Sequence, residues 1–266
     1  MKCSSKLIAL TLVALLSACG PKNEAAAPAA ADPVASAPVA PVTEPAPPAA
    51  AEAATATDAA PVAPVAATPP SGPEPVAGTD YIQIDNGQPF APVAGKIEVA
   101  EVFGYTCPHC AQFEPLINTW KRKQPADVQV TAVPAAFGGY WITYARAFYA
   151  AETLGVLAKS HDAMFNALHV QRSLDPNASP EKIAGFYAQY GVDPKTFVAT
   201  MSSFGVETKL NRAKQFAMRS KVEGTPSIVV AGKYLVSIDQ RGYDVLFNTV
   251  EHLVARERAV RGGAAN

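Results

Sequence analysis

Regular hydrophobic patterning is confined to the part of the chain after residue 78. Alternating apolar and polar residues predict short strands at 81–84, 97–103 and 128–133. Between the last two strands, residues 111–123 place apolar side chains at every third or fourth position, which predicts an amphipathic helix. This succession of strand, helix and strand forms a β-α-β unit.

The pattern becomes mainly helical from Trp141 to Ser220. The expected helices cover residues 142–157, 161–169, 180–190, 194–204 and 206–221. Two short strands follow at 227–230 and 234–236, and they predict a hairpin ahead of a final helix at 243–260. A β-α-β half, a helical block and a β-β-α half indicate a split α/β domain.

The segment before the patterned region has a composition that cannot form a core. Residues 21–78 hold 22 Ala and 14 of the chain's 24 Pro, and they contain no Leu, Ile, Met, Phe, Tyr or Trp. We expect a disordered, semi-rigid tether there, because Pro favours extended polyproline conformations. The residues from 79 to 266 then form one domain that is large enough to bury a core.

The first 18 residues have the features of an export signal. Lys2 and Lys6 form a basic start, and the apolar run that follows is too short to span a bilayer permanently. The next residues, Leu-Ser-Ala-Cys ending at Cys19, resemble the lipobox of bacterial lipoproteins, which implies a lipid-modified Cys19 and membrane attachment. An ordinary signal peptide is the alternative. The expected organisation is a signal peptide at 1–18, a lipidated N-terminus with a linker at 19–78, and a domain at 79–266.

Charge and cysteine content narrow the possible functions. The domain has 19 Lys and Arg against 17 Asp and Glu, which gives no electrostatic reason to expect a nucleic-acid partner. Cys3 is lost with the signal and Cys19 would carry lipid, so the mature domain keeps only Cys107 and Cys110. An exported domain without a long-range cysteine pair has no structural disulfide, so its Cys-x-x-Cys requires another explanation.

The Cys-x-x-Cys lies on the predicted turn between strand 97–103 and the next helix, and Pro108 suits the first helical turn. Cys107 is therefore expected at a helix N-terminus, where unpaired N–H groups and a partial positive charge favour a thiolate. His109 can supply further N–H donors or positive charge to the Cys107 sulfur. These features indicate a redox-active pair, Cys107 and Cys110, that works without a cofactor or metal.

The motif Cys107-Pro108-His109-Cys110, which follows a strand carrying Glu101, resembles the active site of DsbA-type thiol:disulfide oxidoreductases. The resemblance implies a periplasmic enzyme that introduces disulfide bonds into exported proteins with free thiols. In that family Cys107 would be the sulfur attacked by substrate and Cys110 its buried partner. Glu101 would be a buried acid that transfers the proton of Cys110.

A second segment, Gly224-Thr225-Pro226, resembles the cis-proline loop of the same family, and Thr225 and Pro226 would then bind the substrate peptide. The resemblance covers the chain from residue 79 onward. It implies a thioredoxin-like α/β fold with a helical insertion at about 141–220. It also implies reoxidation by a membrane quinone reductase similar to DsbB, and we expect a monomer.

Other functions remain open at this point. The best-known DsbA proteins have Val at the position of Thr225, and a Thr is closer to reductases and isomerases, so a reductase or isomerase using the same cysteines is the main alternative. The dimerisation domain of such isomerases is absent here, and the tether takes its place. A zinc site would need two more ligands from His109, His161, His169 or His252, which show no second paired spacing. A non-enzymatic lipoprotein that binds partners through helices 141–204 leaves the cysteine pair unexplained.

Overall fold

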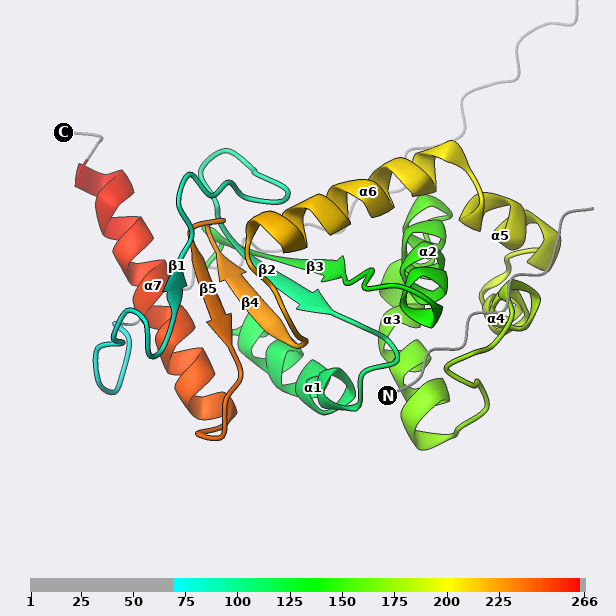
Figure 1. Cartoon of the computed structure of the whole chain (residues 1–266), viewed down its shortest axis with the longest axis horizontal. Coiled ribbons are helices and arrows are strands. Elements are labelled where there is room, and N and C mark those ends of the chain that lie inside the picture. Colours follow the sequence, from blue (N-terminus) through cyan, green and yellow to red (C-terminus); the bar gives the residue numbers. More distant parts are fainter. Residues whose placement is uncertain (1–68, 264–266) are drawn as a thin grey trace, which may run out of the picture. The chain divides into compact units, whose positions relative to one another are not determined.

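The computed structural model describes residues 69–263, which are built around a five-stranded mixed sheet (Figure 1). The strands are β1 (Ile82–Gln83), β2 (Ile97–Phe103), β3 (Val128–Pro134), β4 (Ser227–Val230) and β5 (Tyr234–Ser237). Their order across the sheet is β1-β5-β4-β2-β3, and only β2 and β3 run parallel. β2 is therefore an inner strand, paired on both of its edges.

Helices cover the sheet and extend beyond it. α1 (Pro108–Arg122) connects β2 to β3, and α7 (Tyr243–Gly263) follows β5. The insertion between β3 and β4 contains α2 (Tyr140–Thr153), α3 (Leu157–Phe165), α4 (Pro180–Tyr187), α5 (Pro194–Met201) and α6 (Phe204–Arg219), with a π-helical turn at Asn166–Val170 and a 3₁₀ turn at Ala188–Tyr190. In Figure 1, α2 to α5 group at one end of the sheet and α6 returns along it toward β4.

β2 separates two parts of the core because its side chains alternate between the two faces of the sheet. Ile97 and Val99 pack on the side of α1 and α7, together with Phe113 and other apolar residues. Ala100 and Val102 belong to the core that the sheet shares with the helical insertion. Burial of each large apolar side chain contributes about 1.5–3 kcal/mol. The end of β2, where α1 begins, is thus fixed from both faces.

The observed elements follow the expected ones closely, with local differences. The helix expected at 142–157 ends at Thr153, and α3 begins at Leu157, because Gly155 between them has a positive φ of 72°. The insertion runs from residue 140 to 219, against an expected 141–220. The helix expected at 161–169 is instead the end of α3 followed by the π-helical turn, in which the N–H of Gln171 donates to the carbonyl of Asn166. Hydrophobic spacing cannot predict this change, because α- and π-helical turns bury the same kinds of residue.

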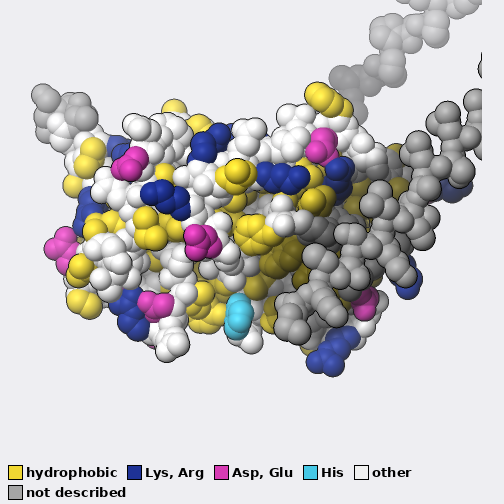
Figure 2. All heavy atoms as spheres, viewed as in Figure 1, with side chains coloured by type: hydrophobic (Ala, Val, Ile, Leu, Met, Phe, Trp, Pro, Cys, Tyr) yellow, Lys and Arg dark blue, Asp and Glu magenta, His cyan; other side chains and the backbone are white. Residues whose placement is uncertain are grey.

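The face shown in Figure 2 carries charge and apolar surface in different places. Several Lys and Arg side chains lie along α6 and others are spread over the lower edges, whereas the largest group of hydrophobic side chains lies at the centre, between α6 and α1, with a histidine below it. Large exposed hydrophobic residues of the described chain include Phe137, Tyr140, Phe204 and Met218.

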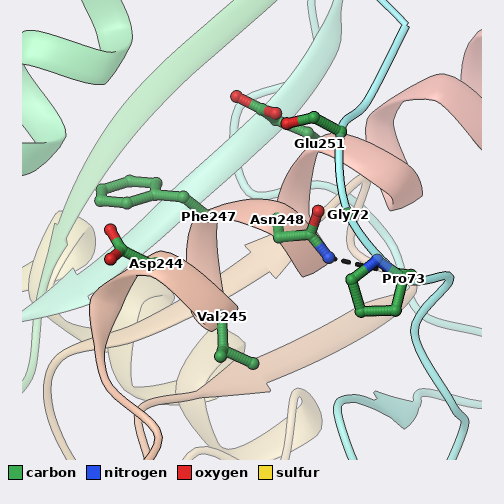
Figure 3. Close-up of a pocket in the computed structure, with 8 residues that line it drawn as sticks. Gly72, Pro73, Asp244, Val245, Phe247, Asn248 and Glu251 are labelled. Atoms are coloured by element: carbon green, nitrogen blue, oxygen red, sulfur yellow. Dashed lines mark hydrogen bonds between the residues drawn. The ribbon is translucent and has the colours of Figure 1, made fainter.

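The described part of the chain includes residues before Thr79, the expected start of the domain. The Asn248 side chain on α7 donates a 2.9 Å hydrogen bond to the carbonyl of Pro73, beside a hollow of about 460 Å³ (Figure 3). Glu74 pairs with Arg256 of the same helix at 3.4 Å. The last residues assigned to the tether therefore lie against α7, because α7 offers polar partners to their backbone and side chains.

The export signal, Cys19 and most of the tether fall outside the described residues. Within residues 69–263, none of the helices combines the length and the apolar character needed to cross a membrane.

Candidate active site

The two cysteines lie where β2 passes into α1. Cys107 is the N-cap residue of α1 and Pro108 follows at the first helical position. The N–H of Cys107 donates to the carbonyl of Gly104 at 3.0 Å, which tightens the turn. Gly104 is required here because a Cβ atom would lie 1.9 Å from the ring of Trp141. The close approach of Trp141 therefore helps to fix the position of Cys107.

Cys107 is in an environment that stabilises its thiolate. Its residue surface is 7% exposed, and its sulfur lies 3.4 Å from the carbonyl oxygen of Thr225. The pKa of Cys107 is lowered to about 5, and the largest cause is a hydrogen bond from the Cys110 thiol. Burial raises this pKa. Thr225 and the backbone N–H groups of Cys110 and His109 lower it further. Cys107 is thus largely ionised at neutral pH.

Cys110 has the opposite character. It is completely buried on the inner face of α1, and its sulfur accepts a 3.5 Å hydrogen bond from the N–H of Gly104. Burial is the main cause that raises the pKa of Cys110, and the neighbouring Cys107 raises it further. Both cysteines are free thiols. The pair therefore combines one sulfur that readily loses its proton with one that retains it.

His109 and Pro108 lie on the exposed side of the turn. The backbone N–H of His109 makes a small contribution to the lowered pKa of Cys107, and the His109 carbonyl accepts a 3.4 Å hydrogen bond from the Tyr243 hydroxyl. No hydrogen bond within residues 69–263 involves the His109 ring. The backbone of His109 thus favours the Cys107 thiolate, and a contribution from its ring stays a prediction.

The loop before β4 meets the cysteines from the other side. The Thr225–Pro226 peptide bond is cis, and the Ser227 hydroxyl donates to the carbonyl of Gly224 at 2.9 Å. This loop lines an open cleft of about 510 Å³ together with residues of β5 such as Leu235. Thr225 and Pro226 are therefore next to Cys107, although 118 residues separate Thr225 from Cys107 in the sequence.

Glu101 lies beneath the site in β2 and is only 3% exposed. Its Oε1 atom is buried and has no hydrogen-bond partner among the described residues. Burial is the largest cause that raises the pKa of Glu101 well above its ordinary value; the charge of Glu114 adds to the effect and Lys121 opposes it. Burial in this position therefore favours the protonated form of the Glu101 carboxyl group.

Sequence reasoning missed a polar cluster beside Glu101. Glu114 lies four residues after Cys110 on α1, where the helical repeat could have indicated a shared face. His161 lies 3.3 Å from Glu114 and 2.7 Å from the Tyr105 hydroxyl, and no local signal in the sequence joins these residues. Within residues 69–263 no group of three or more His, Cys, Asp or Glu side chains is arranged to hold a metal ion.

Comparisons with known proteins agree with this geometry. Residues 131–251 match the family model described as DSBA-like thioredoxin domain. The chain is 39% identical over 184 residues to the thiol:disulfide interchange protein DsbA of Pseudomonas aeruginosa, covering 69% of this chain and 86% of that protein. DsbA of Azotobacter vinelandii is 38% identical over 185 residues, or 69% and 85% of the two chains.

Solved structures lead to the same group. The oxidoreductase DsbA from Xylella fastidiosa superposes with a TM-score of 0.67 at 48% identity, over 70% of this chain and 98% of that one. The Pseudomonas aeruginosa DsbA structure gives a TM-score of 0.64 at 38% identity, over 70% and 96%. The thioredoxin-like α/β fold with a helical insertion, expected from the sequence, is confirmed.

Proposed function

This chain belongs to the DsbA family of thiol:disulfide interchange proteins, and from that premise we propose that it donates a Cys107–Cys110 disulfide to exported proteins in the periplasm. The observation that carries the proposal is the contrast between the two sulfurs, one with a lowered and one with a raised pKa. A stabilised Cys107 thiolate is a good leaving group. Stabilising the reduced form also makes the disulfide oxidising toward other thiols.

The proposed reaction has two exchanges. A substrate thiolate attacks the Cys107 sulfur, forms a mixed disulfide and releases Cys110 as a thiolate, which takes up a proton. A second substrate thiolate attacks the substrate sulfur of the mixed disulfide, forms the substrate's disulfide and releases Cys107 as a thiolate. Two electrons pass from the substrate to the enzyme. The partial exposure of Cys107 and the complete burial of Cys110 support attack at Cys107.

Glu101 is proposed to supply the proton that Cys110 requires. It is buried on β2, and its raised pKa keeps it protonated until a stronger base forms. No hydrogen bond within the described chain joins Glu101 to Cys110, so the transfer needs a bridging water. The Cys110 thiolate is such a base, because burial raises its pKa strongly.

The Thr225–Pro226 loop is proposed to hold the substrate as an extended peptide. Its backbone lies within 3.4 Å of the Cys107 sulfur and beside an open cleft. An extended chain that pairs with exposed backbone gains affinity without depending on its own sequence. That property suits an enzyme that acts on many unfolded proteins.

The remaining parts of the proposal concern location and recycling. Lipid at Cys19 would anchor the protein to a membrane, and the Pro/Ala-rich tether would let the domain reach its substrates. A quinone reductase similar to DsbB would reoxidise the cysteine pair. These features rest on the N-terminal sequence and on family membership.

The test is a stoichiometric oxidation. Oxidised protein, mixed with a reduced, unfolded polypeptide that has two cysteines, should convert one equivalent to the disulfide. Cys107→Ser should abolish all covalent capture, whereas Cys110→Ala should trap mixed disulfides through Cys107. Acid quenching of cells followed by alkylation should recover the wild type mainly oxidised. Recovery mainly as the dithiol would favour the reductase or isomerase that Thr225 suggests.

A further inference from the structure

A second set of buried polar groups lies behind the cysteine pair. Glu114, one helical turn after Cys110, is only 5% exposed. One of its carboxylate oxygens accepts a 3.0 Å hydrogen bond from Asn118 and lies 3.3 Å from Nε2 of His161. The other oxygen is buried without a hydrogen-bond partner in residues 69–263. Glu114 is therefore held through one oxygen only.

Glu114 also acts on Glu101. Its charge is the second cause, after burial, that raises the pKa of Glu101. Each of these carboxyl groups has one buried oxygen with no partner among the described residues. Buried oxygens of this kind normally accept a hydrogen bond. A protonated Glu101 carboxyl group can donate a hydrogen bond, and the described side chains offer these two oxygens no other donor.

The ring of His161 is fixed in one orientation. Its Nδ1 lies 2.7 Å from the hydroxyl of Tyr105. Burial raises the pKa of Tyr105 well above its ordinary value, so this hydroxyl stays protonated and donates a hydrogen bond to Nδ1. The hydrogen of the neutral ring is then on Nε2, which faces Glu114. The ring also packs edge-on against Phe103, Phe148 and Phe165.

We propose that His161 is a positioning residue for the thiol–disulfide exchange: hydrogen-bonded to Tyr105, it holds the Glu114 carboxylate in the interior, on the buried face of α1 that also carries Cys110. From there the charge of Glu114 favours a proton on Glu101. This rests on the proposed function only in its last step, the use of that proton by Cys110. When substrate opens the disulfide, the Cys110 thiolate takes the proton from Glu101. When the pair is reoxidised, the Cys110 thiol returns it.

Other charged groups near His161 face solvent. The ring lines an open cleft of about 940 Å³ between α1, β3, α2 and α3. The ionisable residues that share this cleft are Lys96, Lys121, Arg122, Glu152 and Asp162, all of them exposed. The remaining ionisable neighbour, His169, hydrogen-bonds to the carbonyl of Tyr105. The cleft charges have mixed signs and are screened by water and salt, whereas Glu114 and Glu101 interact in the interior.

The experiment measures the titration of Glu101 in the reduced protein by carbon NMR with labelled Glu carboxyl groups. His161→Phe keeps an aromatic ring but removes the donor to Glu114. We expect the pKa of Glu101 to fall by about one unit in His161→Phe and in Glu114→Gln, and no further in the double variant. His169→Phe is the matched control, since its ring hydrogen-bonds to the Tyr105 carbonyl and makes no hydrogen bond or ion pair with Glu114 among the described residues, and it should leave the titration unchanged.

An unchanged Glu101 titration in His161→Phe, or shifts that simply add in the double variant, would overturn the proposal. If His161→Phe does not fold, Tyr105→Phe removes only the hydroxyl that orients the ring, and it must lower the pKa of Glu101 in the same direction. The pH profile of a single turnover with a dithiol peptide should shift with the titration. The titration of Glu101 needs no redox reaction. If the pKa of Glu101 shifts as expected in a protein that cannot oxidise thiols, the proposed function would be refuted and the role of His161 in positioning Glu114 would be supported.

Discussion

Ionisation of Cys107 should make the stability of the reduced domain fall on acidification. The pKa of Cys107 is about 5 in the folded protein, whereas that of a free cysteine is about 8.5. Between these values the unfolded chain binds more protons than the folded one, so the free energy of unfolding rises with pH in this window. The lowered pKa therefore contributes stability that is complete above about pH 8.5 and is lost as the pH falls through 5.

The size of this contribution follows from the lowered pKa. At pH 7 the pKa of Cys107 is about two units below the pH, which corresponds to about 2.7 kcal/mol. Because the sulfur keeps contact with solvent, screening should reduce the measured value to about 1–2 kcal/mol. The assay is urea unfolding of the reduced wild type and of reduced Cys107→Ser from pH 8 to pH 4. The difference isolates Cys107, since Glu101, whose raised pKa has the opposite effect, is present in both proteins.

We expect the wild type to be more stable than Cys107→Ser at pH 7, by the amount given above, and the difference to vanish below pH 5. The Cys110→Ala variant lacks the thiol whose hydrogen bond lowers the pKa of Cys107 most. In that variant the stability difference should therefore be lost at a higher pH. Stability curves of wild type and Cys107→Ser that stay parallel from pH 8 to pH 4 would refute the reasoning.

Three further predictions concern single residues around the cysteines. His109→Ser should raise the pKa of Cys107 by about one unit, because it removes the charge of the ring. Thiolate absorbance at 240 nm measures this pKa, and an unchanged value would mean that only the backbone N–H acts on the sulfur. Glu101→Gln should slow, by about 10²-fold or more, the step in which the buried cysteine gains a proton, while peptide affinity measured by calorimetry stays the same; equal loss of both would indicate a folding defect. Gly104→Ala should cost about 1–3 kcal/mol in urea unfolding, because its methyl group collides with Trp141, and an unaltered midpoint would contradict that contact.

The parts of this site that could be predicted from the sequence have local signals. Strand alternation, Pro108 and the spacing of Cys107 and Cys110 all lie within one short segment, and they were sufficient to predict a helix N-terminus under the first cysteine. The position of Thr225 beside Cys107 was expected only by resemblance, because no local pattern reports a contact across 118 residues.

The polar cluster beside Glu101 could not be predicted. His161 reaches Tyr105 across 56 residues of sequence, through the packing of α3 against the end of β2. Hydrophobic periodicity shows which face of a helix is buried, but not which residue of another element it meets.

The most direct test of the central claim is the equilibrium of the Cys107–Cys110 pair with glutathione. If the stabilised Cys107 thiolate makes the disulfide oxidising, the purified domain should be half reduced at a potential well above about −180 mV, the value of protein disulfide isomerase. The fraction reduced can be read from alkylation and mass spectrometry across a series of glutathione ratios. A midpoint near about −270 mV, as for thioredoxin, would contradict the account and identify the dithiol as the working form.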